Sequence, residues 1–136
     1  NDAALQGRRL LIDPERVVRK DALTVIQKAK DEGAFFALRQ AIESDIFKSL
    51  PQSEKSEFFV CSGHVNPREG LPMIREYALK SDVLARQPQK ETRVAAIESL
   101  GILRDRGSRA TLEEISKSLR SSGPARTAAQ EAMRKL

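Results

Sequence analysis

The most reactive side chains of this chain are one cysteine and one histidine, Cys61 and His64. A separation of three residues places both on one face of a helix, where a thiol and an imidazole could bind a metal or form a nucleophilic pair. A closed metal site needs four ligands, and the chain has no other cysteine or histidine. Cys61 also lies on the apolar side of its predicted helix, where a thiol packs like a small hydrophobic group. We therefore predict neither a metal site nor a catalytic thiol here.

Carboxylates are the next candidates for chemistry, and they occur as the neighbours Asp31-Glu32 and Glu113-Glu114. Adjacent positions of a helix do not face each other, so neither pair forms an acid–base couple by its spacing. The sequence also contains no glycine-rich phosphate loop, nucleophile elbow or zinc-binding HExxH pattern. The prediction is a protein that is not an enzyme and that has no catalytic residue, metal or cofactor.

The clearest structural pattern lies between Glu91 and Gly107. Its apolar residues recur every three or four positions, as an amphipathic helix requires, and Asp105 and Gly107 indicate a turn after it. A second apolar run from Ala110 to Leu119 has the same spacing. The unit is therefore a helix, a tight turn and a second helix.

Weaker copies of this unit precede and follow it. The copy at Val17–Gly33 aligns at a constant separation of 74 residues, the C-terminal copy at 33, and the most divergent copy, which contains Phe58-Phe59, at 38. The recurring positions are Arg19, Arg93 and Arg126 in the first helix and Asp31 and Asp105 in the turn. Recurrence at one position of a stack predicts arginine–carboxylate and backbone contacts between neighbouring units.

The copies define a single domain over residues 1–136. We predict a partial helix at 1–12, helical pairs at 13–50, 53–81 and 89–120, and a capping helix at 124–136. The unpaired first helix suggests that the chain is part of a longer protein.

Four local features are also expected. Asp13 should cap a helix that has Pro14 in its first position. The second helix of the first pair should run from Ala34 to Leu50, and Pro72 should lie in the first turn of its helix. Residues 82–89 should form a long polar loop.

Composition limits the setting. The chain of 136 residues has 24 basic and 19 acidic side chains, and its formal net charge of +5 is spread among mixed signs. No apolar run approaches the length that spans a bilayer, no signal peptide is visible, and the single cysteine forms no internal disulfide. We expect a cytoplasmic protein without a membrane partner.

The stretches Arg93–Ile115 and Val17–Ile42 resemble HEAT repeats, most closely the short bacterial type first noted in phycobilisome lyases. The resemblance covers about residues 13–136. It implies an all-α fold, a right-handed α-α superhelix of the armadillo type whose second helices line a concave face. It implies a scaffold that binds a protein partner on that face and says little about chemistry, because function belongs to sites and not to folds.

Candidate partner-binding residues follow from the exposed side of the predicted second helices. They are Arg39, Glu43, Arg75, Lys80, Glu113 and Lys117. The alternative is that basic residues of the same face bind the backbone of duplex nucleic acid. Acidic residues on the same helices largely neutralise them, and the absence of tryptophan leaves a poor platform for stacking bases. A protein partner is therefore the preferred prediction.

Overall fold

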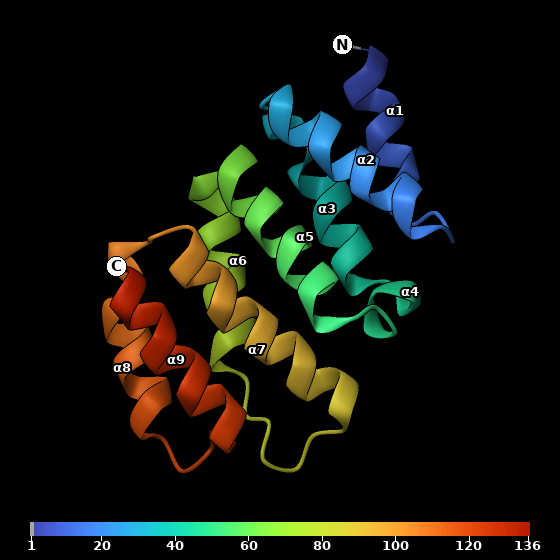
Figure 1. The fold of residues 1–136 in the computed structure, drawn as a ribbon. Helices are drawn as coiled ribbons and strands as arrows, with labels where there is room; N and C mark the ends of the chain where they lie inside the picture. The colour runs from blue at the N-terminus through green and yellow to red at the C-terminus, as the bar shows by residue number, and fades with distance from the viewer. Residues whose placement is uncertain (1) are drawn as a thin grey trace.

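The computed structural model describes residues 2–136, with side chains from Leu5 onward, and its regular elements in that range are helices (Figure 1). The α-helices are α1 (Asp2–Leu10), α2 (Arg16–Lys28), α3 (Phe35–Glu43), α4 (Asp45–Lys48), α5 (Gln52–Val65), α6 (Pro67–Leu79), α7 (Gln87–Ile102), α8 (Arg109–Lys117) and α9 (Gly123–Lys135). Two short 3-10 helices, η1 (Glu32–Ala34) and η2 (Arg106–Ser108), precede α3 and α8.

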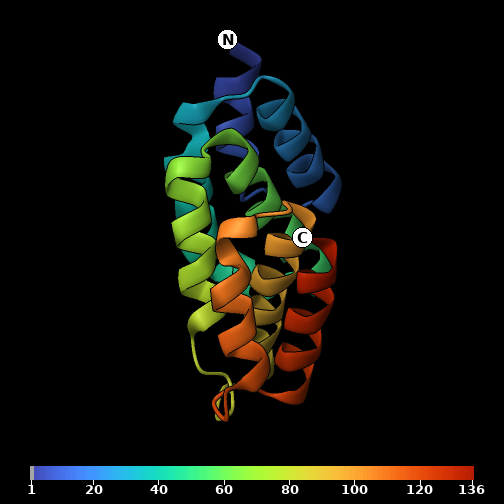
Figure 2. The same ribbon diagram turned by 90° about the vertical axis from the view of Figure 1, so that its left-hand side faces the viewer.

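The helices form two layers. Helices α2, α5, α7 and α9 lie side by side in the layer nearer the viewer in Figure 1, and α1, α3, α6 and α8 lie behind them; Figure 2 shows the two layers from the side. Side chains from both layers meet in one apolar core. The largest fully buried apolar side chains are Phe47, Phe58, Phe59, Leu11, Ile26, Leu38, Ile74, Ile97, Leu100, Leu112 and Ile115. The predicted all-helical class is confirmed.

The aligned turns after α2 and α7 have the same backbone geometry. Lys30 and Arg104 adopt positive φ angles of 50° and 53°, the left-handed conformation that ends many helices. In the first turn the N–H of Asp31 donates to Ile26 O, and in the second the N–H of Asp105 donates to Leu100 O. Neither Gly33 nor Gly107 has a positive φ. A positive φ is therefore not the reason for glycine at these positions. The lack of a side chain instead leaves room for two arginine side chains, which are described with the site below.

Two expected helix boundaries in the first third of the chain were wrong. Helix α2 begins at Arg16, because Asp13 Oδ1 accepts a hydrogen bond from the N–H of Glu15 and caps no helix. The predicted helix from Ala34 to Leu50 is interrupted at Ser44, whose extended backbone (ψ 158°) separates α3 from α4. The apolar residues keep their helical spacing across this break, so the pattern does not predict it.

Pro72 and the loop of residues 82–89 also differ from expectation. Helix α6 begins at Pro67, so Pro72 lies inside the helix, on its exposed side. Its ring leaves the carbonyl of Arg68 without a helical donor, and exposure of both residues lets water satisfy that carbonyl. Helix α7 begins at Gln87, and Asp82 at the start of the loop is buried.

Two glycines allow the front layer to close. A Cβ at Gly101 of α7 would lie 2.8 Å from Cα and 2.9 Å from Cβ of Ala132 in α9. A Cβ at Gly63 of α5 would lie 2.4 Å from Cδ1 of Leu103 at the end of α7. The missing side chains thus permit α5, α7 and α9 to pack at short range.

Candidate functional site

A groove with a volume of about 610 Å³ crosses the front layer between α2, α5 and α7. Its lining residues recur at helical spacing, so one face of each helix contributes. On α5, for example, they are Ser53, Ser56, Glu57 and Val60. A second groove of about 540 Å³ between α7 and α9 shares Glu98 and Lys135 with the first. The two grooves are therefore adjacent, and together they are lined by four helices.

The first groove is lined by three aliphatic side chains, called its floor below, together with polar and charged residues. Leu23 of α2, Val60 of α5 and Ile102 of α7 supply its aliphatic surface. Beside them, Ser56 is 8% exposed, and its Oγ has no hydrogen-bond partner among the described residues. A buried hydroxyl without a partner costs about 1–3 kcal/mol. Ser56 thus brings to the wall of the groove a buried hydroxyl whose hydrogen-bonding capacity is unused among the described residues.

Charged side chains surround this floor. Lys20 and Lys28 come from α2, Lys135 comes from the end of α9, and the acidic residues Glu57 and Glu98 come from α5 and α7. Glu98 already accepts a hydrogen bond of 3.0 Å from Nε2 of Gln52. An apolar floor with a mixed, mostly cationic rim is suited to a partner that carries both apolar and acidic groups.

The residues predicted to bind a partner on the second helices divide into different environments. Arg39 and Glu43 are exposed and pair with each other on α3 at 3.1 Å. Lys80 lies over the ring of Tyr77, 4.2 Å from its centroid. Glu113 and Lys117 of α8 are exposed.

Arg75 does not belong to an open surface. Its Nη2 lies 2.6 Å from Oδ2 of Asp105, and its Nε donates to Oγ of Ser108 at 2.8 Å. The half-buried guanidinium therefore joins α6 to the turn after α7, and a contact predicted for a partner is made inside the protein.

The same contact recurs at the first turn. Nε of Arg8 in α1 donates to Oδ2 of Asp31 at 2.7 Å, and a second hydrogen bond makes the pair bidentate. The two guanidinium groups cross the turn glycines, because a Cβ would approach Arg8 at Gly33 and Arg75 at Gly107. Each aspartate and glycine of the turn thus accommodates an arginine from the preceding helix of the back layer.

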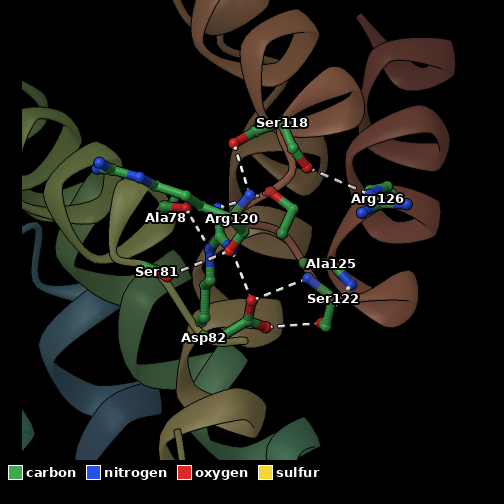
Figure 3. Close-up of polar contacts among 10 residues, drawn as sticks. Ala78, Ser81, Asp82, Ser118, Arg120, Ser122, Ala125 and Arg126 are labelled. Atoms are coloured by element: carbon green, nitrogen blue, oxygen red, sulfur yellow. Dashed lines mark hydrogen bonds and ion pairs between the residues drawn. The ribbon is translucent and has the colours of Figure 1, made fainter. Parts of the chain in front are cut away.

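Arg93 ties α7 to the end of α6 and to two connections of the chain. Its guanidinium donates to Ala78 O at 2.8 Å, to Oδ1 of Asp82 at 2.7 Å, to Arg120 O at 3.2 Å and to Oγ of Ser121 at 3.0 Å. Figure 3 shows the continuation of this network, in which Asp82 accepts hydrogen bonds from N and Oγ of Ser122, the residue that caps α9.

Asp82 stays ionised in this network. Burial alone would raise its pKa, but the hydrogen bonds from Ser122 and Arg93 outweigh burial and hold the pKa of the carboxyl below its usual value. The aspartate and Arg93 therefore form a buried pair in which both charges are satisfied.

The aligned arginines at the two ends make related contacts. Arg19 donates to both carboxylate oxygens of the buried Glu54 in α5, at 2.5 and 3.0 Å, and to the carbonyls of Asp13 and Pro14. Arg126 donates to Ser118 O in the connection before α9, at 3.3 Å.

Sequence reasoning missed Lys55, which is fully buried in α5. It lies 38 residues before Arg93, the separation that also relates Gly63 to Gly101, so it occupies the position of the aligned arginines. Its Nζ donates to Pro88 O at 2.9 Å and lies 5.8 Å from the ring centroid of Phe47. Burial lowers the pKa of Lys55, which Glu91 partly opposes. The separation of 38 residues was the signal that could have found it.

Cys61 and His64 do not meet in a site. Cys61 is buried, and burial raises the pKa of its thiol to about 12, which leaves it protonated and unreactive. His64 is exposed. The described residues contain no group of three or more histidine, cysteine or acidic side chains placed to hold a metal ion.

Comparisons with models of protein families, with curated proteins and with solved structures found no match to this chain. None of the helices described here is both long and apolar enough to cross a bilayer. The function must therefore be argued from the geometry of the grooves and surfaces.

Proposed function

We propose that this protein is an interaction module that binds a helical segment of a protein partner in the groove between α2, α5 and α7. The observation that carries the proposal is the aliphatic surface of Leu23, Val60 and Ile102, beside which the hydroxyl of Ser56 has no hydrogen-bond partner in the part of the chain that the structure describes. A bound segment would place apolar side chains against Leu23, Val60 and Ile102 and a polar group against Ser56.

The charges around the groove support an acidic partner. Lys20, Lys28 and Lys135 line the groove together with Glu57 and Glu98, and Glu98 accepts a hydrogen bond from Gln52. Carboxylates beside the apolar face of the segment would pair with the three lysines and set its orientation.

The proposed surface differs from the one that the sequence suggested. Among the second-helix residues, Arg75 is held by Asp105 and Arg39 is paired with Glu43. The two grooves that share Glu98 and Lys135 lie in the layer of the first helices. We therefore favour this layer over α3, α6 and α8 as the binding face.

We also propose that the helical pairs are HEAT-like repeats of the short bacterial type in a cytoplasmic protein. Support comes from the turns after α2 and α7, which share a left-handed residue, an aspartate and an arginine contact at a separation of 74 residues. The recurrence of one local structure at one sequence interval is the property that defines repeat proteins.

Site-specific photo-cross-linking tests the binding face. A photoreactive residue replaces the exposed Thr24 in the groove, and in a matched protein it replaces Gln40 on α3. We expect a discrete protein adduct from the lysate of the source cells with the Thr24 probe and none with the Gln40 probe. An adduct formed only by the Gln40 probe would place the partner on the second helices.

A substitution at Ser56 separates binding from folding. Ser56→Ala removes the hydroxyl that has no partner, so the free energy of unfolding should rise by about 1 kcal/mol while the yield of the Thr24 adduct falls. Ser62→Ala is the control, because the hydroxyl of Ser62 already donates to Phe58 O. An unchanged adduct yield in Ser56→Ala would remove this serine from the proposed site.

A further inference from the structure

Two neighbouring loops at one end of the molecule expose aliphatic side chains that no packing requires. Leu84, in the connection between α6 and α7, is 98% exposed, and Leu119, in the connection between α8 and α9, is 90% exposed. Val83 and Leu79 beside them are each 46% exposed. These four residues are called the leucine tip below.

The loops of the leucine tip are held together. N of Asp82 donates to Arg120 O at 3.4 Å, and N and Oγ of Ser122 donate to the carboxylate of Asp82 at 3.0 and 2.7 Å. Figure 3 shows these contacts, and Figures 1 and 2 place both loops at the lower extremity of the molecule. The exposed aliphatic groups therefore sit on a fixed, protruding end.

The net charge of the protein resides at the same end. Residues 80–90 and 117–126 contain six of the 24 basic residues and one of the 19 acidic residues. The remaining 18 residues of each sign cancel, so these two segments account for the whole formal charge of +5. The one acidic residue, Asp82, is buried against Arg93, whereas Lys80, Arg86, Lys117 and Arg120 are exposed.

We propose that the leucine tip docks this protein onto the surface of an anionic lipid bilayer. Cations attract an anionic membrane, and aliphatic side chains that enter the boundary between headgroups and acyl chains add hydrophobic affinity. A protruding end fits a flat surface better than it fits a peptide, which binds in a groove. Duplex nucleic acid would use the cations but would leave the leucines in water.

A surface of this kind leaves no continuous apolar run in the sequence. A segment that spans a bilayer is one long apolar run, whereas the leucine tip is assembled from two short loops that lie about 36 residues apart in the chain. Each loop alone contains too few apolar residues to stand out.

Vesicle sedimentation tests the proposal. The protein should sediment with vesicles of equal parts phosphatidylcholine and phosphatidylglycerol, and much less with phosphatidylcholine alone. Binding should weaken as salt is added, because salt screens the attraction of exposed charges. Equal binding to the two compositions, or no binding to either, would overturn the proposal.

Two double variants separate the hydrophobic contribution to vesicle binding from the electrostatic one. Leu84→Ser combined with Leu119→Ser should weaken binding to the anionic vesicles about tenfold at constant charge. Arg86→Gln combined with Arg120→Gln should weaken it roughly fivefold for each arginine removed. All four side chains are exposed, so circular dichroism and thermal melting should match the wild type.

Matched controls lie elsewhere on the surface. Val17→Ser with Phe36→Ser removes exposed apolar groups from α2 and α3, and Arg106→Gln with Arg109→Gln removes two exposed charges at the start of α8. Both controls should bind the anionic vesicles like the wild type. Equal losses in control and test variants would overturn the assignment to the tip. Leucine variants that bind normally, or tighter binding to a random DNA duplex than to vesicles, would overturn it as well.

Discussion

Helices α5 and α7 occupy aligned stretches of the sequence, yet they use the same positions differently. Each has a buried cation near its start, Lys55 or Arg93, and a closely packed glycine near its end, Gly63 or Gly101. The Arg93 guanidinium reaches two carbonyls, a carboxylate and a hydroxyl, whereas the Lys55 ammonium reaches only Pro88 O among the described residues.

The difference follows from the shape of the two cations. A guanidinium has five N–H donors fixed in one plane and can join several acceptors at once, whereas an ammonium is a compact and strongly hydrated charge. Helix α7 is therefore fixed to the connection that precedes it and to the connection between α8 and α9. Helix α5 retains the cost of a buried charge at Lys55 and of the hydroxyl without a partner at Ser56. The groove that we assign to a partner lies along this less satisfied helix.

Removing the arginine should have the largest effect. Arg93→Ala leaves the buried Asp82 without its counter-charge, and we expect the free energy of unfolding to fall by about 3–5 kcal/mol. Urea denaturation followed by circular dichroism measures this change. Arg106→Ala, at an exposed site, should change stability by less than about 0.5 kcal/mol. A loss in Arg93→Ala below about 1 kcal/mol would show that the network is not a strong tie.

We expect Gly101→Ala to destabilise the protein more than Gly63→Ala does. Gly101→Ala forces a Cβ against the backbone of α9 at Ala132, and we expect a loss of about 1–3 kcal/mol. The three atoms nearest to a Cβ at Gly63 all belong to the side chain of Leu103, which is half-buried and can change rotamer, so Gly63→Ala should cost less. Thermal melting of the two variants gives the comparison. A greater loss at Gly63 would contradict the view that α7 and α9 form the tighter contact.

Acid should weaken the ion pair between Arg93 of α7 and Asp82. The pKa of Asp82 is lowered in the folded protein, so its contribution to stability is complete above the unfolded value of about 4 and disappears as the pH falls through the folded value. We expect the wild type to lose stability below about pH 4 more steeply than Asp82→Asn does. Melting temperatures measured from neutral pH into acid check the slopes. If the melting temperatures of the two proteins fell in parallel, other carboxylates, such as Asp31 and Asp105, would dominate the loss of stability in acid.

The smallest effect is expected at Lys55. Lys55→Met keeps the length of the side chain and removes the buried charge, so stability at neutral pH should stay within about 1 kcal/mol of the wild type or exceed it. Burial lowers the pKa of Lys55, so the unfolded chain binds more protons than the folded chain does. The free energy of unfolding of the wild type should therefore rise relative to that of Lys55→Met as the pH rises toward about 10. Denaturation at neutral and alkaline pH measures this gain. A variant that loses several kcal/mol would show that the contact with Pro88 O is stabilising.

The sequence predicted the helices well where apolar periodicity governs them. It located the turns at Asp31 and Asp105 and the helices on either side of them, because each depends on residues near one another in the chain. It did not predict the break at Ser44, since the apolar spacing continues through both α3 and α4. Pro72 was misplaced because the start of α6 was not fixed by the pattern.

The binding groove and the leucine tip could not be derived in the same way. The groove combines outward-facing residues of α2, α5 and α7, and the tip combines two loops, so both depend on how distant segments meet. The exposure of Leu84 and the missing partner of Ser56 are properties of the folded surface. Lys55 was within reach, because the separation that pairs Gly63 with Gly101 also pairs Lys55 with Arg93.

The hydrogen bonds of Asp82 have a consequence for how the chain opens. Its carboxylate holds Ser122, which itself caps α9, while Arg93 fixes Asp82 from α7. Helix α9 therefore cannot fray from its start without exposing a buried ion pair one helix away. Amides of α7 and of the first turns of α9 should consequently exchange with solvent as one cooperative unit, although the segments are distant in the chain.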